Sequence, residues 1–369
     1  MADHSSSDHK DSGARTGGLL PATGLLAELG ASIPLVAAPM AGGPSSPALV
    51  LAAAEAGGLG FLAGGYKKPD QLAGQITEVR AGVAAFGVNL FGVNLFAPNP
   101  VPIDTDAFTE YAQALRELAA TYDINLQDVE ALEDDDDWED KVDMLVDDPV
   151  PVVSFTFGLP PAEAVRRLQK AGSLVIQTVT SPGEAEQAAA LGVDGLVVQS
   201  YKAGGHSGTL TPATPVAQIP LTDLLTRVRS KVELPLWAAG GVSTPDAVRD
   251  ALSHGAEAVV VGSVLLRSPE SGASTPYKEA LADEDRTETV VTTAFSGRPA
   301  RALRNRFTDR FHPLAPGGYP ALHHLTSPIR KAAAAAGDPE TINIWAGTGY
   351  RDATEEPAAD ILRRLAGAR

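Results

Sequence analysis

Eight short apolar segments recur along the chain, and most are followed by a segment with the apolar periodicity of a helix. Apolar runs of a few residues, bounded by glycine or proline, are typical of buried parallel strands. The predicted strands are 34–40, 59–63, 91–95, 150–157, 174–179, 196–198, 236–239 and 257–261. The predicted helices among them are 48–56, 69–80, 106–122, 162–171, 182–191, 221–232 and 246–254. This alternation predicts an α/β fold, a (β/α)8 barrel, with an open doubly wound sheet as the alternative.

The third predicted strand is preceded by a copy of itself, because Phe-Gly-Val-Asn-Leu stands at both 86–90 and 91–95. Five residues are too few for a structural repeat, and the odd offset turns the two copies toward opposite faces of a sheet. Only one copy can therefore fill a given role. We predict that the second copy is the strand, since the segment 96–98 ends it directly. Asn94 is then favoured over Asn89 at the strand end, with both kept as candidates.

The rest of the chain divides into a tail, the barrel with an insertion, and a C-terminal extension. Residues 1–24 are polar and are expected to form a disordered tail. The barrel occupies 25–268 and begins with a short helix or barrel-bottom plug. Within it, 100–149 form an insertion that is helical and then strongly acidic. We interpret the acidic run 130–140 as a solvated loop, since it lacks the alternation with glycine of a calcium-binding loop.

The C-terminal extension, 269–369, is expected to be mostly helical, with a basic run at 292–306. Its predicted helices are 276–282, 327–336 and 357–365. The extension is too small and discontinuous for a core of its own. We therefore expect it to pack over the barrel and complete the active site.

Composition narrows the class of protein. The chain has 369 residues, of which 44% are hydrophobic, as is ordinary for a globular protein with a sizeable core. It has no cysteine, which excludes disulfides, thiolate metal sites and thiol nucleophiles and suits a reducing cytoplasm. The formal net charge of -17 argues against a nucleic-acid partner. No apolar run approaches the roughly 20 residues that span a bilayer, and the start lacks the apolar region of a signal peptide. A cytoplasmic location without a membrane partner is expected.

The ends of the predicted strands carry the candidate chemistry, because barrel enzymes build their sites at the carboxyl ends of the strands. The pairs Gly240-Gly241 and Gly262-Ser263 follow the last two strands, where backbone N–H groups commonly hold a phosphate. The amide side chains of Asn94 and Gln199 both donate and accept, which suits the edge of a heteroaromatic ring such as a flavin.

A single histidine follows the sixth strand within the glycine-rich segment 204–208. Glycines on both sides of His206 allow close approach of the backbone to a ligand. The imidazole is therefore a candidate general base or hydrogen-bond donor, and a tight turn with a solvated histidine is the alternative.

Together these segments resemble the nitronate monooxygenase family, formerly called 2-nitropropane dioxygenases. The matching segments are 38–42 (Ala-Pro-Met-Ala-Gly), 91–96 (Phe-Gly-Val-Asn-Leu-Phe), Gln199 with 203–208 (Ala-Gly-Gly-His-Ser-Gly), 238–241 (Ala-Ala-Gly-Gly), 262–263 (Gly-Ser), 294–301 and 345–349. They occur in order from about residue 34 to 365. The resemblance thus covers nearly the whole chain.

The resemblance implies a TIM barrel that contains FMN and oxidises alkyl nitronates, such as propionate 3-nitronate, with dioxygen to a carbonyl compound and nitrite. It makes His206 the catalytic residue, either as a neutral base or, when protonated, as a donor to the nitro group. It implies no metal, a small-molecule nitronate or nitroalkane as partner, and is compatible with a homo-oligomer. The residues expected at FMN are Met40, Ala41, Gly42, Asn94, Gln199, Gly204, Gly240, Gly241, Val261, Gly262 and Ser263.

Two other functions remain open, because related flavin enzymes share the barrel and the Gly-Gly-His segment. One is an NAD(P)H-dependent flavin reductase acting on an enoyl thioester or a quinone. The other is a non-catalytic module that binds a flavin or another small molecule. The chain also departs from the family at Lys202, where an acidic residue is usual, and this cation is expected to change the preferred charge of the substrate.

Overall fold

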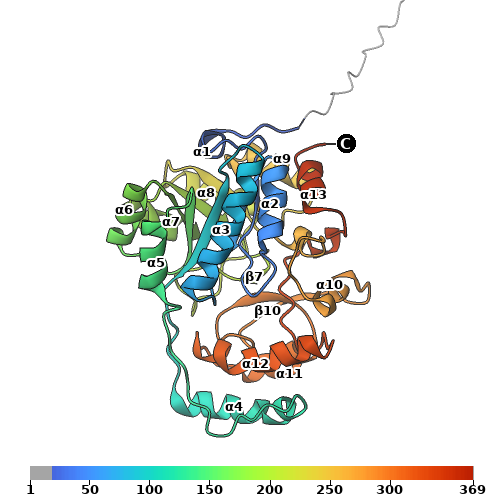
Figure 1. Cartoon of the computed structure of the whole chain (residues 1–369). Coiled ribbons are helices and arrows are strands. Elements are labelled where there is room, and N and C mark those ends of the chain that lie inside the picture. The colour runs from blue at the N-terminus through green and yellow to red at the C-terminus, as the bar shows by residue number, and fades with distance from the viewer. Residues whose placement is uncertain (1–18, 369) are drawn as a thin grey trace, which may run out of the picture.

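In the computed structural model, which describes residues 19–368, eight parallel strands close into a barrel (Figure 1). The strands in barrel order are β1 (Leu35–Ala37), β2 (Leu59–Ala63), β3 (Phe91–Ala97), β4 (Val152–Phe157), β5 (Leu174–Val179), β6 (Gly195–Gln199), β8 (Leu236–Ala239) and β9 (Ala258–Val261). β9 pairs with β1, which closes the ring. The (β/α)8 prediction is confirmed, and the open-sheet alternative is wrong.

A helix follows each of the first seven barrel strands, and an eighth comes from the end of the chain. The seven are α2 (Pro47–Glu55), α3 (Pro69–Ala85), α5 (Trp138–Asp147), α6 (Ala162–Ala171), α7 (Pro182–Ala190), α8 (Leu221–Arg229) and α9 (Pro245–Ser253). The last helix, α13 (Ala358–Leu365), packs against α2 and α9 and fills the gap after β9 (Figure 1). The barrel is therefore completed by a segment that lies beyond the predicted barrel range.

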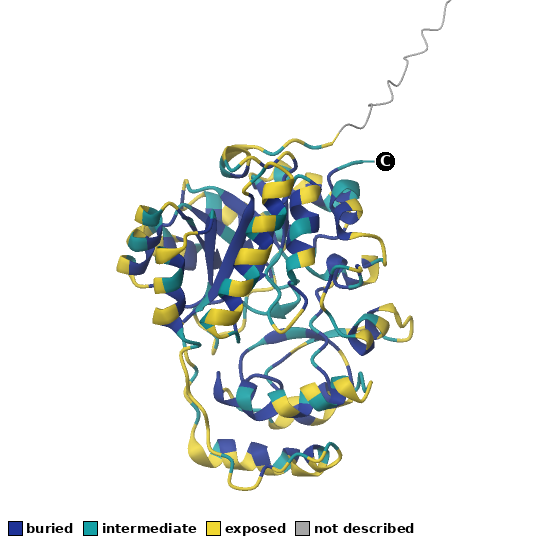
Figure 2. Cartoon of the chain, viewed as in Figure 1, coloured by how far each residue is buried: buried dark blue, intermediate teal, exposed yellow. Residues whose placement is uncertain are grey.

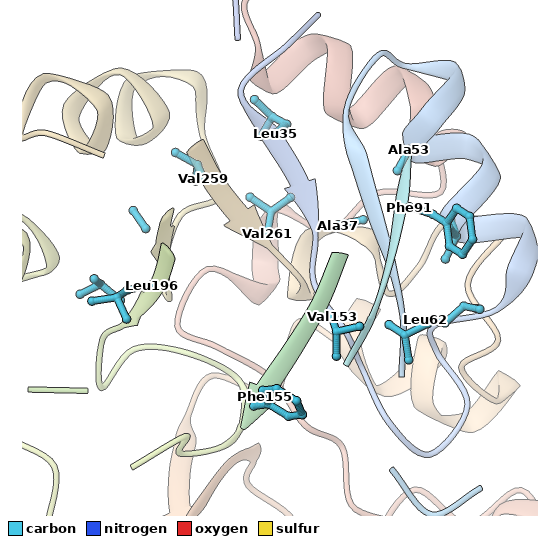
Figure 3. Close-up of a cluster of buried hydrophobic side chains, with 14 of the residues drawn as sticks. Leu35, Ala37, Ala53, Leu62, Phe91, Val153, Phe155, Leu196, Val259 and Val261 are labelled. Carbon is cyan, nitrogen blue, oxygen red and sulfur yellow. The ribbon is translucent and has the colours of Figure 1, made fainter. Parts of the chain in front are cut away.

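The core consists of two apolar layers on opposite sides of the strands. Side chains alternate along each strand, so that Val260 of β9 belongs to the barrel interior while Val259 and Val261 face the helices. Figure 3 shows Val259 and Val261 beside Leu35 of β1 in the outer layer. At the amino end of the barrel, the buried Leu26 of α1 (Gly24–Glu28) joins the inner layer, which confirms the predicted plug.

Residues 19–23, before α1, lie against the rest of the chain. Residues 1–18 of the expected disordered tail lie outside the described residues. From residue 19 onward the chain is bound to the barrel, because the N–H groups of Leu20 and Ala22 donate to the carbonyl oxygens of Ala366 and Ser32. The tail prediction was therefore too long at its carboxyl end.

The acidic part of the insertion contains a helix that the sequence analysis missed. α5 is the barrel helix between β3 and β4, and it begins at Trp138 within the run taken as a solvated loop. Trp138 is 4% exposed and packs 5.4 Å from the ring of Phe155. Trp138, Val142 and Leu145 form the apolar face of α5. The aspartates that precede this helix make the segment look like a solvated loop in the sequence, so its helical periodicity was not recognised.

The extension was expected to be mostly helical, but it also supplies two strands. β10 (Thr289–Thr292) pairs with β11 (Ala300–Leu303), and β11 pairs with β7 (Gly205–His206), all antiparallel. Its helices are α10 (Thr275–Ala282), α11 (Arg306–Phe311) and α12 (Ala321–Ala335), besides α13. α12 begins six residues before its predicted start and runs through Pro328, which sequence analysis had placed at a helix start.

The extension shares a second core with the first helix of the insertion, α4 (Thr105–Ala120). Phe108, Tyr111 and Leu115 of α4 are buried against side chains such as Phe307 and Leu325. The buried side of α4 faces α11 and α12 (Figure 2). The extension does not form this core alone, and the insertion supplies the apolar surface that it lacks.

Candidate active site

A cavity of about 190 Å³ lies at the carboxyl ends of the barrel strands, where the sequence placed the site. Ten of the predicted site residues line it: Met40, Ala41, Asn94, Gln199, Gly204, His206, Gly240, Gly241, Gly262 and Ser263. Two do not. Gly42 lines a neighbouring outer cavity, and the side chain of Val261 lies in the outer core, so that Val260 lines the site in its place.

One rim of this cavity is made of glycines that bring two loops together. A Cβ atom on Gly204 would lie 2.4 Å from the backbone nitrogen of Gly347, so only glycine allows this approach. The hydroxyl oxygen of Ser263 accepts a hydrogen bond from the same nitrogen, at 2.9 Å. Ser263 opens a short 3-10 helix (Ser263–Leu265), whose first N–H groups have no partner within the helix. The rim therefore offers backbone donors of the kind that bind a phosphate.

Asn94 lines the cavity with an amide side chain that is only partly hydrogen-bonded. Its side chain is 3% exposed, and its Oδ1 accepts hydrogen bonds from Ser154 Oγ at 2.8 Å and Thr156 Oγ1 at 3.0 Å. The Nδ2 group has no hydrogen-bond partner among the described residues, so it is available to donate to a ligand. Asn89 is exposed in the loop between α3 and β3, where the first copy of the repeat follows the end of α3. Of the two asparagines, only Asn94 lines the cavity.

Gln199 has a different environment from the one predicted. Its Nε2 donates to the carbonyl oxygen of His206 at 3.3 Å, and its Oε1 accepts from the N–H of Gly208 at 2.8 Å. Both ends of the amide therefore bind the histidine segment. Gln199 lines the cavity, but its hydrogen bonds position His206.

His206 lies on β7 and not in a free loop, since β7 pairs with β11 of the extension. Its Nε2 is 2.8 Å from the Oγ of Ser296. When the Ser296 hydroxyl donates to the carbonyl oxygen of Arg298, 3.3 Å away, its oxygen accepts from the imidazole. This arrangement places the proton of the neutral imidazole on Nε2 and leaves a free lone pair on Nδ1.

The surroundings of His206 keep it neutral. Its ring lies 5.4 Å from Phe157 and 5.2 Å from Trp345, measured between ring centroids. Burial, followed by the positive charges of Arg298 and Arg330, lowers the pKa of His206 to about 3. A neutral base is therefore favoured over a protonated donor in the free site, a choice that the sequence left open.

Arg298 organises the segments around His206, and sequence reasoning assigned it no role beyond the basic run. Its side chain is 0% exposed, and its guanidinium donates to the carbonyl oxygens of Asn99, Phe157 and Thr209. The guanidinium also lies 4.2 Å from the centre of the Phe157 ring. Phe157 has a φ of +82°, which is rare for a residue with a side chain, and Arg298 holds it there. No local pattern reveals these partners.

Lys202 does not line any of the cavities described for residues 19–368. Its ammonium lies 5.9 Å from the ring of Tyr201, and its carbonyl oxygen accepts from the N–H of Thr348. The expected effect of this cation on substrate charge thus has no support in the geometry.

An outer cavity of about 650 Å³ adjoins the first and is lined in part by α12. Asp134, Asp135, Asp136 and Asp137 line one wall. The solvated-loop interpretation fails for Asp136, which is paired with Lys141 at 2.8 Å. Within the described range, no three histidine, aspartate or glutamate side chains are grouped as metal ligands. Over the same range, no helix has the length and apolarity to cross a membrane.

The chain is similar to known proteins over most of its length. The family model described as nitronate monooxygenase matches residues 24–367. A probable nitronate monooxygenase of Staphylococcus aureus (strain Newman) is 33% identical over 339 residues, which are 90% of this chain and 93% of that protein. The solved nitroalkane oxidase from Streptomyces ansochromogenes is 44% identical, with a TM-score of 0.84, over 90% of this chain and 94% of its own.

FabK from Thermotoga maritima is also similar, with 26% identity, a TM-score of 0.70, and coverage of 91% of this chain and 92% of its own. The fold and the site thus define an oxidoreductase of the flavin-dependent TIM-barrel class. Within that class, the chain belongs to the nitronate monooxygenase family.

Proposed function

We propose that this protein uses FMN to oxidise alkyl nitronates, such as propionate 3-nitronate, with dioxygen to a carbonyl compound and nitrite. The observation that carries the proposal is His206, a neutral imidazole at the cavity that the family's glycine segments surround. A nitronate is the anionic conjugate base of a nitroalkane, which is a carbon acid, and a neutral base beside buried cations suits its formation and binding.

The residues of the inner cavity fit a flavin mononucleotide. Asn94 would donate from Nδ2 to an acceptor of the ring, and the backbone around Gly241 and Ser263 would hold the phosphate. Because Gly204 has no side chain, the loops that carry Gly204 and Gly347 can approach each other closely. The chemistry that FMN would supply when bound is a two-electron oxidation of the substrate, followed by transfer of these electrons to dioxygen.

The chain's own residues would prepare the substrate. With Nε2–H bound to Ser296, the Nδ1 atom of His206 is free to take the proton from the carbon that bears a nitro group. Arg298 and Arg330, whose charges lower the pKa of His206, also favour the anionic nitronate over the neutral nitroalkane near the imidazole. Phe157 and Trp345 limit water around it.

A second candidate is an NAD(P)H-dependent flavin reductase acting on an enoyl thioester or a quinone. The outer cavity favours it, since about 650 Å³ is more space than a short nitronate requires. A non-catalytic flavin-binding module is less well supported, because His206 and its partner Ser296 form a complete pair.

An anaerobic titration followed at the flavin absorbance separates these functions. The proposal expects ethylnitronate to bleach the flavin, and air to restore its colour with release of nitrite. Bleaching by NADH but not by the nitronate would instead establish the reductase. The variant His206→Asn should keep its flavin and lose turnover on nitroethane. A cytoplasmic location and a homo-oligomeric state remain predictions, to be checked by cell fractionation and light scattering.

A further inference from the structure

The inner and outer cavities share five aromatic lining residues beside His206, together called the collar here. Its members are Tyr66, Phe96, Phe157, Tyr277 and Trp345, each of which lines both cavities. A molecule that moves from the outer cavity into the inner one beside His206 therefore passes along these side chains. The space that these side chains leave free therefore limits the size of a substrate that reaches His206.

Tyr66 is the collar residue on the loop that follows β2. Its φ is +65°, a left-handed conformation that a tyrosine rarely adopts. The ring stacks on the imidazole of His323 in α12, with centroids 3.7 Å apart and planes inclined by 6°. The ring also makes a T-shaped contact with Phe96, with centroids 5.2 Å apart. The ring is thus held between the barrel and the extension.

A four-residue segment, Asp134 to Asp137, contacts Tyr66 and the residue next to His323, and is called the acidic clasp here. Asp136 Oδ1 accepts a hydrogen bond from the backbone N–H of Tyr66 at 2.9 Å. Asp134 Oδ2 lies 3.1 Å from the imidazole of His324, the residue next to His323. Asp136 and Asp137 both have positive φ, at +61° and +53°. Backbone strain at two segments that contact each other often marks a functional constraint.

The other anchors of the clasp fix its position on the barrel. Asp136 pairs with Lys141, which is 1% exposed, at 2.8 Å. Asp137 pairs with the exposed Lys68 at 2.9 Å. The buried Lys141 makes Asp136 the firmest point of the clasp, and this carboxylate is also the one that binds Tyr66. The conformation of Tyr66 therefore depends on Asp136.

We propose that Tyr66 is a specificity-determining residue, whose ring limits the bulk of the substituent on the nitro-bearing carbon, and that Asp136 is its positioning residue. The inference rests on the proposed function for the identity of the substrate. It goes beyond that function in one respect: the collar makes the site prefer small nitronates to nitronates that carry an aryl group.

The variant Tyr66→Gly tests the ring directly, because glycine adopts the left-handed conformation without strain and the fold is preserved. The ratio of kcat/KM for the nitronate of phenylnitromethane to that of nitroethane should rise about tenfold, as removal of a pocket wall allows. Tyr66→Phe keeps the ring and should leave the ratio unchanged. An unaltered ratio in Tyr66→Gly would overturn the proposal.

A second readout does not depend on turnover. Propionate and phenylacetate are carboxylate analogues of the two nitro compounds, and their Kd values are measured from the perturbation of the flavin spectrum. Tyr66→Gly should strengthen phenylacetate binding relative to propionate by about the same factor. If the wild type releases no nitrite but this ratio shifts, the proposed function fails while the role of Tyr66 stands. If nitrite is released and neither ratio shifts, only the role of Tyr66 fails.

Asp136 is tested by Asp136→Ala, with Asp136→Asn as the conservative variant that keeps an acceptor for Tyr66. Asp136→Ala should shift both ratios in the same direction as Tyr66→Gly, and Asp136→Asn should restore most of the selectivity. The matched control is Asp135→Ala, since Asp135 lines the same wall and has no hydrogen bond or ion pair among the described residues. Equal effects of Asp136→Ala and Asp135→Ala would refute the positioning role.

Discussion

The Nε2 atom of His206 lies 2.8 Å from the Oγ atom of Ser296, a residue 90 positions away in the chain. The two meet because β11 of the extension pairs with β7, which places Ala300 opposite His206. The barrel thus supplies the histidine, and the extension supplies the hydroxyl that binds its Nε2 atom.

Removal of that hydroxyl should lower activity without loss of the flavin. In Ser296→Ala, Nε2–H loses its acceptor and the imidazole is free to rotate or to change tautomer. We expect kcat with nitroethane to fall about tenfold, the equivalent of roughly 1.4 kcal/mol, with unchanged flavin content. Steady-state nitrite release measures the effect. Ser207→Ala is the control, and an equal loss in both variants would show that the Ser296 contact has no special role.

The lowered pKa of His206 predicts how stability depends on pH. Its pKa in the folded protein is about 3, below the ordinary 6.5, so the unfolded chain binds a proton that the folded protein does not. The free energy of unfolding should therefore fall as the pH drops from 6.5 toward 3, with a contribution of up to about 1.4 kcal/mol per pH unit. Burial also lowers the pKa of His323, so its contribution to the pH dependence of stability has the same sign.

Urea unfolding of the wild type and His206→Asn at several pH values between roughly 4 and 7 measures this contribution. Most of the range between the folded and the unfolded pKa of His206 lies within these limits. The variant should lose less stability on acidification than the wild type. If the free energy of unfolding fell equally with pH in both proteins, His206 would have an ordinary pKa in the folded protein. His254→Asn is a suitable control, because that histidine is exposed at the end of α9.

The repeated pentapeptide offers a matched pair of variants. Asn94→Ala removes the free Nδ2 donor from the cavity and should raise the Kd of FMN about tenfold, as loss of one hydrogen bond of roughly 1.4 kcal/mol would. Asn89→Ala makes the same change in the same local sequence, but at an exposed position, and should leave the Kd unchanged. Fluorescence titration of the apoprotein with FMN compares them. Similar Kd values for both variants would contradict the assignment of Asn94.

The contact between the Gly204 and Gly347 loops can be tested by one methyl group. In Gly204→Ala the new Cβ atom would meet Gly347 at 2.4 Å, so one loop must move. We expect a loss of stability of roughly 1–3 kcal/mol together with weaker flavin binding. Gly74→Ala, on the exposed face of α3 with no heavy atom within 4 Å, should instead add about 0.5–1 kcal/mol. Thermal unfolding distinguishes the two.

Much of the barrel followed from local pattern. A parallel strand buried on both faces is a short apolar run, and glycine or proline marks its ends, so the eight strands were found with small errors at their boundaries. α5 was missed because its acidic residues outnumber its apolar face, and β10 and β11 because half-buried strands of four residues have little pattern. The strand-end residues gathered as expected, since parallel strands end on the same side of the barrel.

The sequence by itself determined the barrel, the end of it that bears the site, and the candidacy of His206, since each depends on residues close together in the chain. Only the tertiary structure decided between Asn94 and Asn89, gave His206 its partner Ser296, and set the role of Arg298. These outcomes depend on pairing and burial between segments far apart in sequence. Hydrogen-bond partners and local dielectric are properties of the packed molecule, and no single segment carries a signal for them.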